Sequence, residues 1–142
     1  MNRRKENANK GFSLVELIIV VAIMAVLVGV LAPQYIKYVE KSRVSADATT
    51  TDEFVRAMQI LASDVDVTLD STKTYTVTSA ADSDSITISN DLKTAFGSAS
   101  SVDTSKTYTY KSTSYKAADI TLTLSYDATA KMWKVTTANV PN

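Results

Sequence analysis

The feature that most constrains this chain is an apolar run from Phe12 to Ala32 that contains one ionisable side chain, Glu16. The run holds 21 residues. At about 1.5 Å per residue it makes a helix of about 30 Å, which matches the hydrocarbon core of a bilayer. A carboxylate inside such a segment is costly and needs a partner. The central question is therefore what neutralises Glu16.

The residues before the run are polar and basic. They are Arg3, Arg4, Lys5 and Lys10, against one acidic residue, Glu6. Basic residues that flank a first apolar segment stay cytoplasmic, which predicts that the C-terminal body lies outside. An ordinary signal peptide fits less well, because the run exceeds the usual 7–15 residues, contains Glu16 and lacks a clear A-x-A-like cleavage site. A plain single-pass anchor explains the length but not the glutamate.

The stretch Gly11-Phe12-Ser13-Leu14-Val15-Glu16 resembles the processing site of type IV prepilins and pseudopilins. Residues 32–43 are similar to the segment that follows the apolar run in many type IV pilins. The resemblance covers about a third of the chain, residues 1–45. It implies that a prepilin peptidase cuts between Gly11 and Phe12 and that the new amine of Phe12 is N-methylated. The eleven-residue leader resembles the short-leader class of pilins.

Helical spacing predicts that the apolar run continues as one helix to about Val65. Apolar residues that form the predicted buried stripe are Phe54, Met58, Leu61 and Val65, with Tyr35, Val39 and Ala46 upstream. The predicted solvent face carries Lys37, Lys41, Arg43, Asp47, Asp52, Glu53 and Arg56. The β-branched residues 49–51 predict a locally soft helix. Pro33 predicts a kink, and Gly29 adds a second weak point. The resemblance implies that this region loses helicity in a filament, although Ala25 stands where many relatives have Gly.

Two partners for Glu16 remain open. Burial of a lone carboxylate costs several kcal/mol, and the helix dipole returns only about 0.3–1 kcal/mol. After the cut, the amine of Phe12 can pair with Glu16 of the same helix or with Glu16 of a neighbouring subunit. The resemblance implies the second arrangement, in which Glu16 aligns incoming subunits. Self-pairing and a protonated structural Glu16 are the alternatives.

The remainder, residues 66–142, has the alternating pattern of short strands. Strands are predicted over 74–78, 85–89, 106–111, 120–126 and 131–136, with a turn at 127–130. A short helix is predicted over 90–97, with Asn90 as its N-cap and Gly97 as its stop. Predicted core residues are Phe96, Ile120, Leu122, Leu124, Val135, and Met132 or Trp133. These elements predict an α+β fold, in which a long kinked N-terminal helix packs on a small antiparallel sheet. This layout agrees with the pilin fold that the resemblance implies.

Other candidate sites have simpler interpretations. The sequence has no Cys and no His. It therefore lacks the residues for disulfides, thiol nucleophiles and Ser-His-Asp triads, and we predict no enzyme and no cofactor. Two groups of aspartates, Asp64, Asp66 and Asp70 and then Asp82 and Asp84, lack the calcium-loop pattern and are interpreted as solvated loop charge. Tyr108, Tyr110 and Tyr115, with Lys111 and Lys116, are interpreted as a cross-strand ladder rather than a nucleic-acid surface.

The predicted organisation is a cleaved leader (1–11), an apolar helix half (12–33), an amphipathic helix half (34–65) and a sheet head (66–142). The resemblance implies a type IV pilus subunit that sits in the cell membrane before assembly and in an extracellular homo-oligomeric filament afterwards. It also implies partners, namely the prepilin peptidase, an assembly platform and an ATPase motor. Adhesion, surface motility, aggregation and DNA uptake are the roles the family implies. The alternatives are a pseudopilin of a type II secretion or DNA-uptake apparatus and a monomeric membrane-anchored binding module.

Overall fold

The computed structural model of this chain describes residues 11–81, 85–99 and 102–141. In chain order its elements are α1 (Leu14–Ser63), β1 (Tyr75–Ser79), β2 (Ser85–Ile88), α2 (Asn90–Ala99), β3 (Tyr108–Thr109), α3 (Thr113–Ala117), β4 (Thr121–Asp127) and β5 (Met132–Ala138). The chain divides into two compact units, Met1–Tyr38 and Val39–Asn142. The second unit, called the head below, holds the sheet and the second half of α1.

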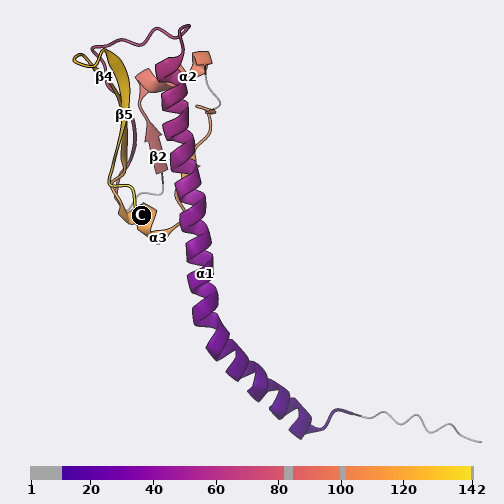
Figure 1. Cartoon of the computed structure of the whole chain (residues 1–142). Coiled ribbons are helices and arrows are strands. Elements are labelled where there is room, and N and C mark those ends of the chain that lie inside the picture. The colour runs from indigo at the N-terminus through magenta and orange to yellow at the C-terminus, as the bar shows by residue number, and fades with distance from the viewer. Residues whose placement is uncertain (1–10, 82–84, 100–101, 142) are drawn as a thin grey trace, which may run out of the picture. The chain divides into compact units, whose positions relative to one another are not determined.

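The head contains one five-stranded sheet in the order β3-β2-β1-β4-β5, and every neighbouring pair is antiparallel. Strands β4 and β5 form a hairpin that pairs Thr121 with Ala138 at one end and Asp127 with Met132 at the other. Figure 1 shows this hairpin, in yellow, at one side of the head, where β1 separates it from β2. The architecture is therefore the α+β arrangement that the sequence predicts, a long helix with a small antiparallel sheet.

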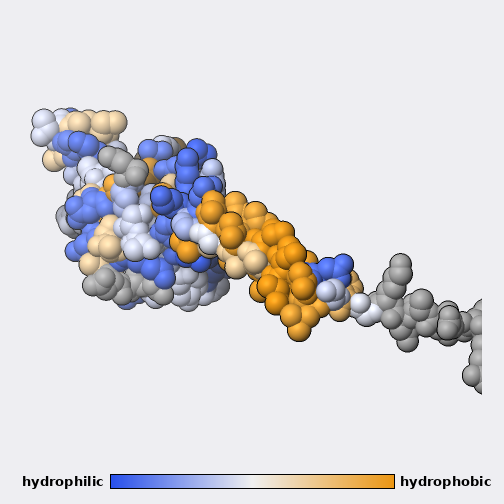
Figure 2. Space-filling model, turned by 90° about the horizontal axis from the view of Figure 1, so that it is seen from below, coloured by the Kyte–Doolittle hydropathy of each residue, from blue (hydrophilic) through white to orange (hydrophobic). Residues whose placement is uncertain are grey.

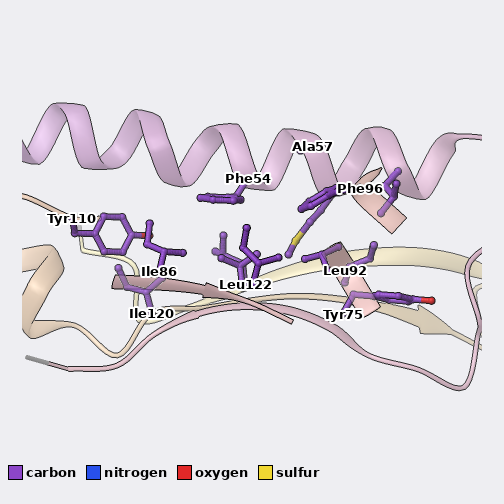
Figure 3. Close-up of a cluster of buried hydrophobic side chains, with 14 of the residues drawn as sticks. Phe54, Ala57, Tyr75, Ile86, Leu92, Phe96, Tyr110, Ile120 and Leu122 are labelled. Atoms are coloured by element: carbon purple, nitrogen blue, oxygen red, sulfur yellow. The ribbon is translucent and has the colours of Figure 1, made fainter. Parts of the chain in front are cut away.

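The core lies between α1 and one face of the sheet (Figure 3). Strand residues alternate between buried and exposed positions because successive side chains point to opposite faces. Buried hydrophobic side chains come from α1 (Phe54, Ala57, Met58, Leu61), the sheet (Tyr75, Val77, Ile86, Ile88, Leu122, Leu124), α2 (Leu92, Phe96) and the connections (Tyr110, Tyr115, Ile120). Threonines occupy the opposite face, where Thr76 pairs with Thr123, and Thr78 with Thr121. The sheet thus has one apolar and one hydroxyl face.

The stripe that α1 buries begins with polar residues. Asp47 is only 2% exposed, although it was predicted on the solvent face. Its carboxylate accepts hydrogen bonds from the Lys111 N–H (2.9 and 3.0 Å), the Ser112 N–H (2.6 Å) and the Ser112 hydroxyl (2.6 Å). The prediction was wrong because the burial of a carboxylate depends on donors sixty-five residues away in the sequence.

Two further contacts fasten the same segment to α1. The Thr51 hydroxyl lies 3.0 Å from the Tyr110 hydroxyl, and the Thr113 N–H donates to Glu40 Oε1. Burial raises the pKa of Tyr110, so its phenol stays neutral and able to share this hydrogen bond. Residues 110–113, called the docked segment below, are thereby bonded to α1 at three positions along one face of the helix, Glu40, Asp47 and Thr51.

The prediction was also wrong at both ends of the buried stripe of α1. Val65 is 97% exposed and lies beyond the end of α1 at Ser63, because the chain has already turned away from the sheet. Tyr35 and Ala46 are exposed, and Val39 is partly buried. The helix remains unbroken through residues 49–51, whose hydroxyls bond to carbonyl oxygens one turn earlier. Local β-branching therefore does not interrupt α1.

Three predictions about the shorter elements were inaccurate. Helix α2 continues through Gly97 to Ala99, and its N-cap is Ser89, whose carbonyl accepts from the Lys93 N–H (2.9 Å). Strand β3 keeps only two residues, because the chain after it is held by α1 instead of by the sheet. The short helix α3 was not predicted. Its N-cap is Ser112, whose hydroxyl accepts from the Tyr115 N–H (3.4 Å).

The sequence left open whether Met132 or Trp133 faces the core, and in the β4–β5 hairpin Trp133 does. Trp133 is partly buried against the core and Met132 is 58% exposed. At the turn, Asp127 accepts from the N–H groups of Thr129 and Ala130, and these bonds lower the pKa of its carboxyl group. Val135 is likewise only partly buried, because β5 is an edge strand.

We predict that Asp47→Ala lowers the free energy of unfolding of the head by at least about 3 kcal/mol. The change leaves three donors without their acceptor, and each buried unsatisfied donor costs about 1–3 kcal/mol. Urea unfolding followed by the fluorescence of Trp133 measures the change. Asp52→Ala is the control, because Asp52 is exposed on the same helix. Equal stability of the two variants would contradict the role of Asp47 as the acceptor for these three donors.

Candidate functional site: the N-terminal turn of the apolar helix

The first unit exposes every described side chain from Gly11 to Tyr38. Its large hydrophobic residues range from 46% exposed at Val20 to 86% at Phe12. In the described part of the chain, α1 is the one helix long and apolar enough to cross a membrane. Figure 2 shows these residues as an orange apolar stretch. Because this apolar surface has no cover among the residues that the structure describes, lipid or other protein is needed to shield it from water.

Glu16 has a partner in the structure, and it is local. The Ser13 N–H donates to Glu16 Oε2 (2.9 Å), while the Ser13 hydroxyl oxygen accepts from the Val15 N–H (3.3 Å). The first helical bond runs from the Leu17 N–H to the Ser13 carbonyl (3.2 Å). This arrangement is a capping box with Ser13 as the N-cap and Glu16 at the third helical position, except that the Ser13 hydroxyl accepts from the second helical N–H instead of the third.

The capping box is the feature that sequence reasoning missed. The spacing Ser13-x-x-Glu16 before an apolar run is its known sequence signature, so the signal was present. It was overlooked because Glu16 was considered only as a charge in an apolar segment. The helix accordingly begins at Leu14, two residues later than predicted.

The other predicted site residues lie at separate positions along the chain. Gly11 and Phe12 precede α1 and are exposed, so the predicted cut lies in non-helical backbone. Gly29 and Pro33 lie inside α1, which is continuous through both. A Cβ added at Gly11 or Gly29 would meet no heavy atom within 4 Å. Packing within this subunit therefore does not require a glycine at either place.

The aspartate and tyrosine groups do not form ligand sites in the described residues. Asp64 accepts from the Asp66 N–H, and Asp70 accepts from Thr72, bonds that hold loop backbone. Asp82 and Asp84 lie outside the described residues. Within the described part of the chain, no group of three or more His, Cys, Asp or Glu residues is placed to hold a metal ion.

The predicted cross-strand tyrosine ladder is wrong. Tyr110 and Tyr115 are buried with ring centroids 5.1 Å apart, and Tyr115 belongs to α3. Tyr108 instead meets Phe54 of α1 edge-on at 5.0 Å. The three rings pack around the docked segment and α1, because the chain leaves the sheet after Thr109.

Comparison with known proteins places a family motif on this same turn. Residues 7–32 match the family described as the prokaryotic N-terminal methylation motif. The chain is 39% identical over 54 residues to the type IV major fimbrial protein FimA of Dichelobacter nodosus, covering 38% of this chain and 35% of that protein. It is 44% identical over 46 residues to a fimbrial protein of Moraxella nonliquefaciens, covering 32% and 30%.

This N-terminal segment is similar to that of type IV fimbrial proteins. The chain spans about a third of the length of the curated relatives it matches. No solved structure matches. The methylation motif covers Gly11, Phe12, the capping box and most of the apolar helix half, so this match lies on the exposed unit.

We predict that Ser13→Ala loosens the first turn of α1. Loss of an N-cap costs about 1 kcal/mol, which corresponds to about fivefold faster exchange of the Val15 amide hydrogen. NMR hydrogen exchange on the detergent-solubilised chain measures it. Ser42→Ala, an exposed change farther along α1, should leave Val15 unaffected. Unchanged exchange in Ser13→Ala would exclude a working cap.

Proposed function

We propose that this chain is a pilin subunit that is cut after Gly11, N-methylated at Phe12 and assembled from the membrane into a surface filament. The observation that carries the proposal is the apolar half of α1, which exposes all of its side chains immediately after the methylation motif. Such a surface is stable in lipid before assembly and among copies of itself afterwards. The sequence of events then gives the four segments 1–11, 12–33, 34–65 and 66–142.

The proposed role of Glu16 is to set the register between subunits. Removal of the leader converts the Phe12 peptide nitrogen into a cationic amine. A carboxylate among apolar helices costs several kcal/mol unless a cation and hydrogen bonds compensate it. Glu16 Oε2 is used by the Ser13 N–H, while Oε1 has no partner among the described residues. The second oxygen is therefore available to the Phe12 amine of a neighbouring subunit.

Gly29 and Pro33 have a proposed mechanical role in the same helix. Proline removes one backbone hydrogen bond, and glycine costs roughly 0.5–1 kcal/mol relative to alanine in a helix. Both residues precede the first contact between α1 and the docked segment at Glu40. Loss of helicity around them would leave the attachment of the head intact.

The remaining partners follow from the same proposal. A prepilin peptidase would cut the leader, and an assembly platform with an ATPase motor would extract the subunit from the membrane. Adhesion, surface motility, aggregation and DNA uptake are the roles open to such a filament. Recovery of long filaments composed of this protein from sheared cells would support a pilus. Short, cell-bound assemblies would favour the pseudopilin alternative, and an uncut monomer would favour a membrane-anchored module.

Processing is tested by Gly11→Val. A branched side chain next to the scissile bond should block the peptidase, so mass spectrometry should find the leader retained and Phe12 unmethylated. The wild-type chain should begin at N-methylated Phe12. Gly97→Val is the control, because a Cβ there also meets no heavy atom within 4 Å. A wild-type chain with its leader intact would overturn the proposal.

The role of Glu16 is tested by two substitutions, one that removes both its capping bond and its charge and one that removes the charge alone. Glu16→Ala should leave membrane insertion intact and abolish most sheared filament, because both the cap and the charge are lost. Glu16→Gln keeps an acceptor for the Ser13 N–H, since glutamine also serves in capping boxes, but it removes the charge. It should also fail to assemble. Normal filaments from Glu16→Gln would assign Glu16 to capping alone, and Glu53→Ala on the exposed side of α1 is the control.

A further inference from the structure

A cavity of about 500 Å³ lies in the head between the last turns of α1 and the β4–β5 hairpin. From α1 it is lined by Gln59, Ala62 and Ser63, and from β5 by Met132, Trp133 and Val135. The volume falls within the range of about 300–1,000 Å³ typical of small-molecule sites. None of these residues takes part in the N-terminal turn described above.

The aromatic member of this site is held in a fixed orientation. The Trp133 ring meets Tyr75 edge-on with centroids 5.8 Å apart, and Tyr126 edge-on at 5.5 Å. Both contacts have an interplanar angle of 63°. Edge-to-face pairs of this kind are worth about 0.5–1.5 kcal/mol beyond burial. Trp133 nevertheless stays partly exposed, so the ring forms a rigid apolar platform that a ligand can reach.

Polar groups accompany the platform. Gln59 is exposed, and its side-chain amide has no hydrogen-bond partner among the described residues. The backbone carbonyl of Gln59 accepts from the Ser63 hydroxyl (3.0 Å). Asp127 and Lys134 also line the cavity. The Thr129 and Ala130 N–H groups both bond to Oδ1 of Asp127, which leaves Oδ2 available among the described residues.

We propose that this cavity binds a neutral saccharide. A sugar ring presents C–H groups on its faces and hydroxyl groups around its edge, which suits an apolar floor bordered by an amide and a carboxylate. A purely apolar ligand would leave Gln59 and Asp127 without partners, at a cost for each buried polar group. Asp127 and Lys134 carry opposite charges, so the lining has no net charge and suits a neutral ligand.

A neighbouring cavity extends the same surface. It has a volume of about 550 Å³, is lined by Arg56, Ile60 and Asp64, and shares Gln59 and Ser63 with the first. A chain of several sugar units could therefore pass across the end of α1. We accordingly expect oligosaccharides to bind more tightly than single sugars.

The single tryptophan of the chain provides the measurement. The full chain, solubilised in a detergent without a sugar head group, is titrated with two neutral tetrasaccharides, cellotetraose and tetra-N-acetylchitotetraose. At least one should change the Trp133 emission saturably, and glucose or N-acetylglucosamine should do so more weakly. The absence of any change with both tetrasaccharides at millimolar concentration would overturn the proposal.

Gln59→Ala supplies the residue-level test. Loss of one ligand hydrogen bond should weaken binding by about three- to tenfold. Gln34→Ala removes the same amide from the exposed first unit and should leave binding unchanged. Equal binding by Gln59→Ala and the wild type would place the saccharide elsewhere and overturn the assignment.

The outcome is distinguishable from that of the proposed function, because saccharide binding does not depend on leader cleavage or assembly. A methylated mature chain that forms filaments but gives no emission change would overturn this inference alone. A change of Trp133 emission on assembly, together with no response to saccharide in the subunit, would assign the cavity to a second copy of the chain and overturn it as well.

Discussion

The head depends on one seam along α1, formed by residues spaced alternately four and three apart. The seam consists of Glu40, Val44, Asp47, Thr51, Phe54, Met58 and Leu61. Its C-terminal part is apolar and packs on the sheet, while Glu40, Asp47 and Thr51 bind the docked segment. An apolar stripe fixes which face of a helix is buried, but hydrogen bonds from a carboxylate also fix its position along the axis. Asp47 therefore determines where the docked segment meets α1.

The alternation of strands and the apolar part of the seam could be predicted from sequence, because both arise from local periodicity. Leu122 and Leu124 were identified as core in this way and are fully buried. The docked segment could not be predicted, since its backbone donors become partners of Asp47 only in the folded chain. Helix α3 depends on the same contact through its N-cap, Ser112, which explains why no propensity signal revealed it.

At the N-terminal turn, the sequence drew attention to Glu16 but did not reveal its local partner, the Ser13 N–H. Glu16 was recognised because a charge in an apolar run is expensive. Its bond to the Ser13 N–H follows an equally local rule, and the two readings are compatible since a carboxylate can accept several hydrogen bonds. The kink at Pro33 stays a prediction. By contrast, Val65 was misassigned because periodicity continues in the sequence past the residue at which the helix ends.

The two halves of α1 differ in what surrounds their apolar side chains. The head buries its apolar residues in a core formed with its own sheet. The first unit has no such cover, and its stability depends on what surrounds it. Under the proposed function, the capping box has a consequence for assembly, because it binds one oxygen of Glu16 to the backbone at the start of the helix. A carboxylate held in this way loses little further side-chain entropy when it meets a cation, so the ordering of Glu16 is largely complete before a second subunit arrives.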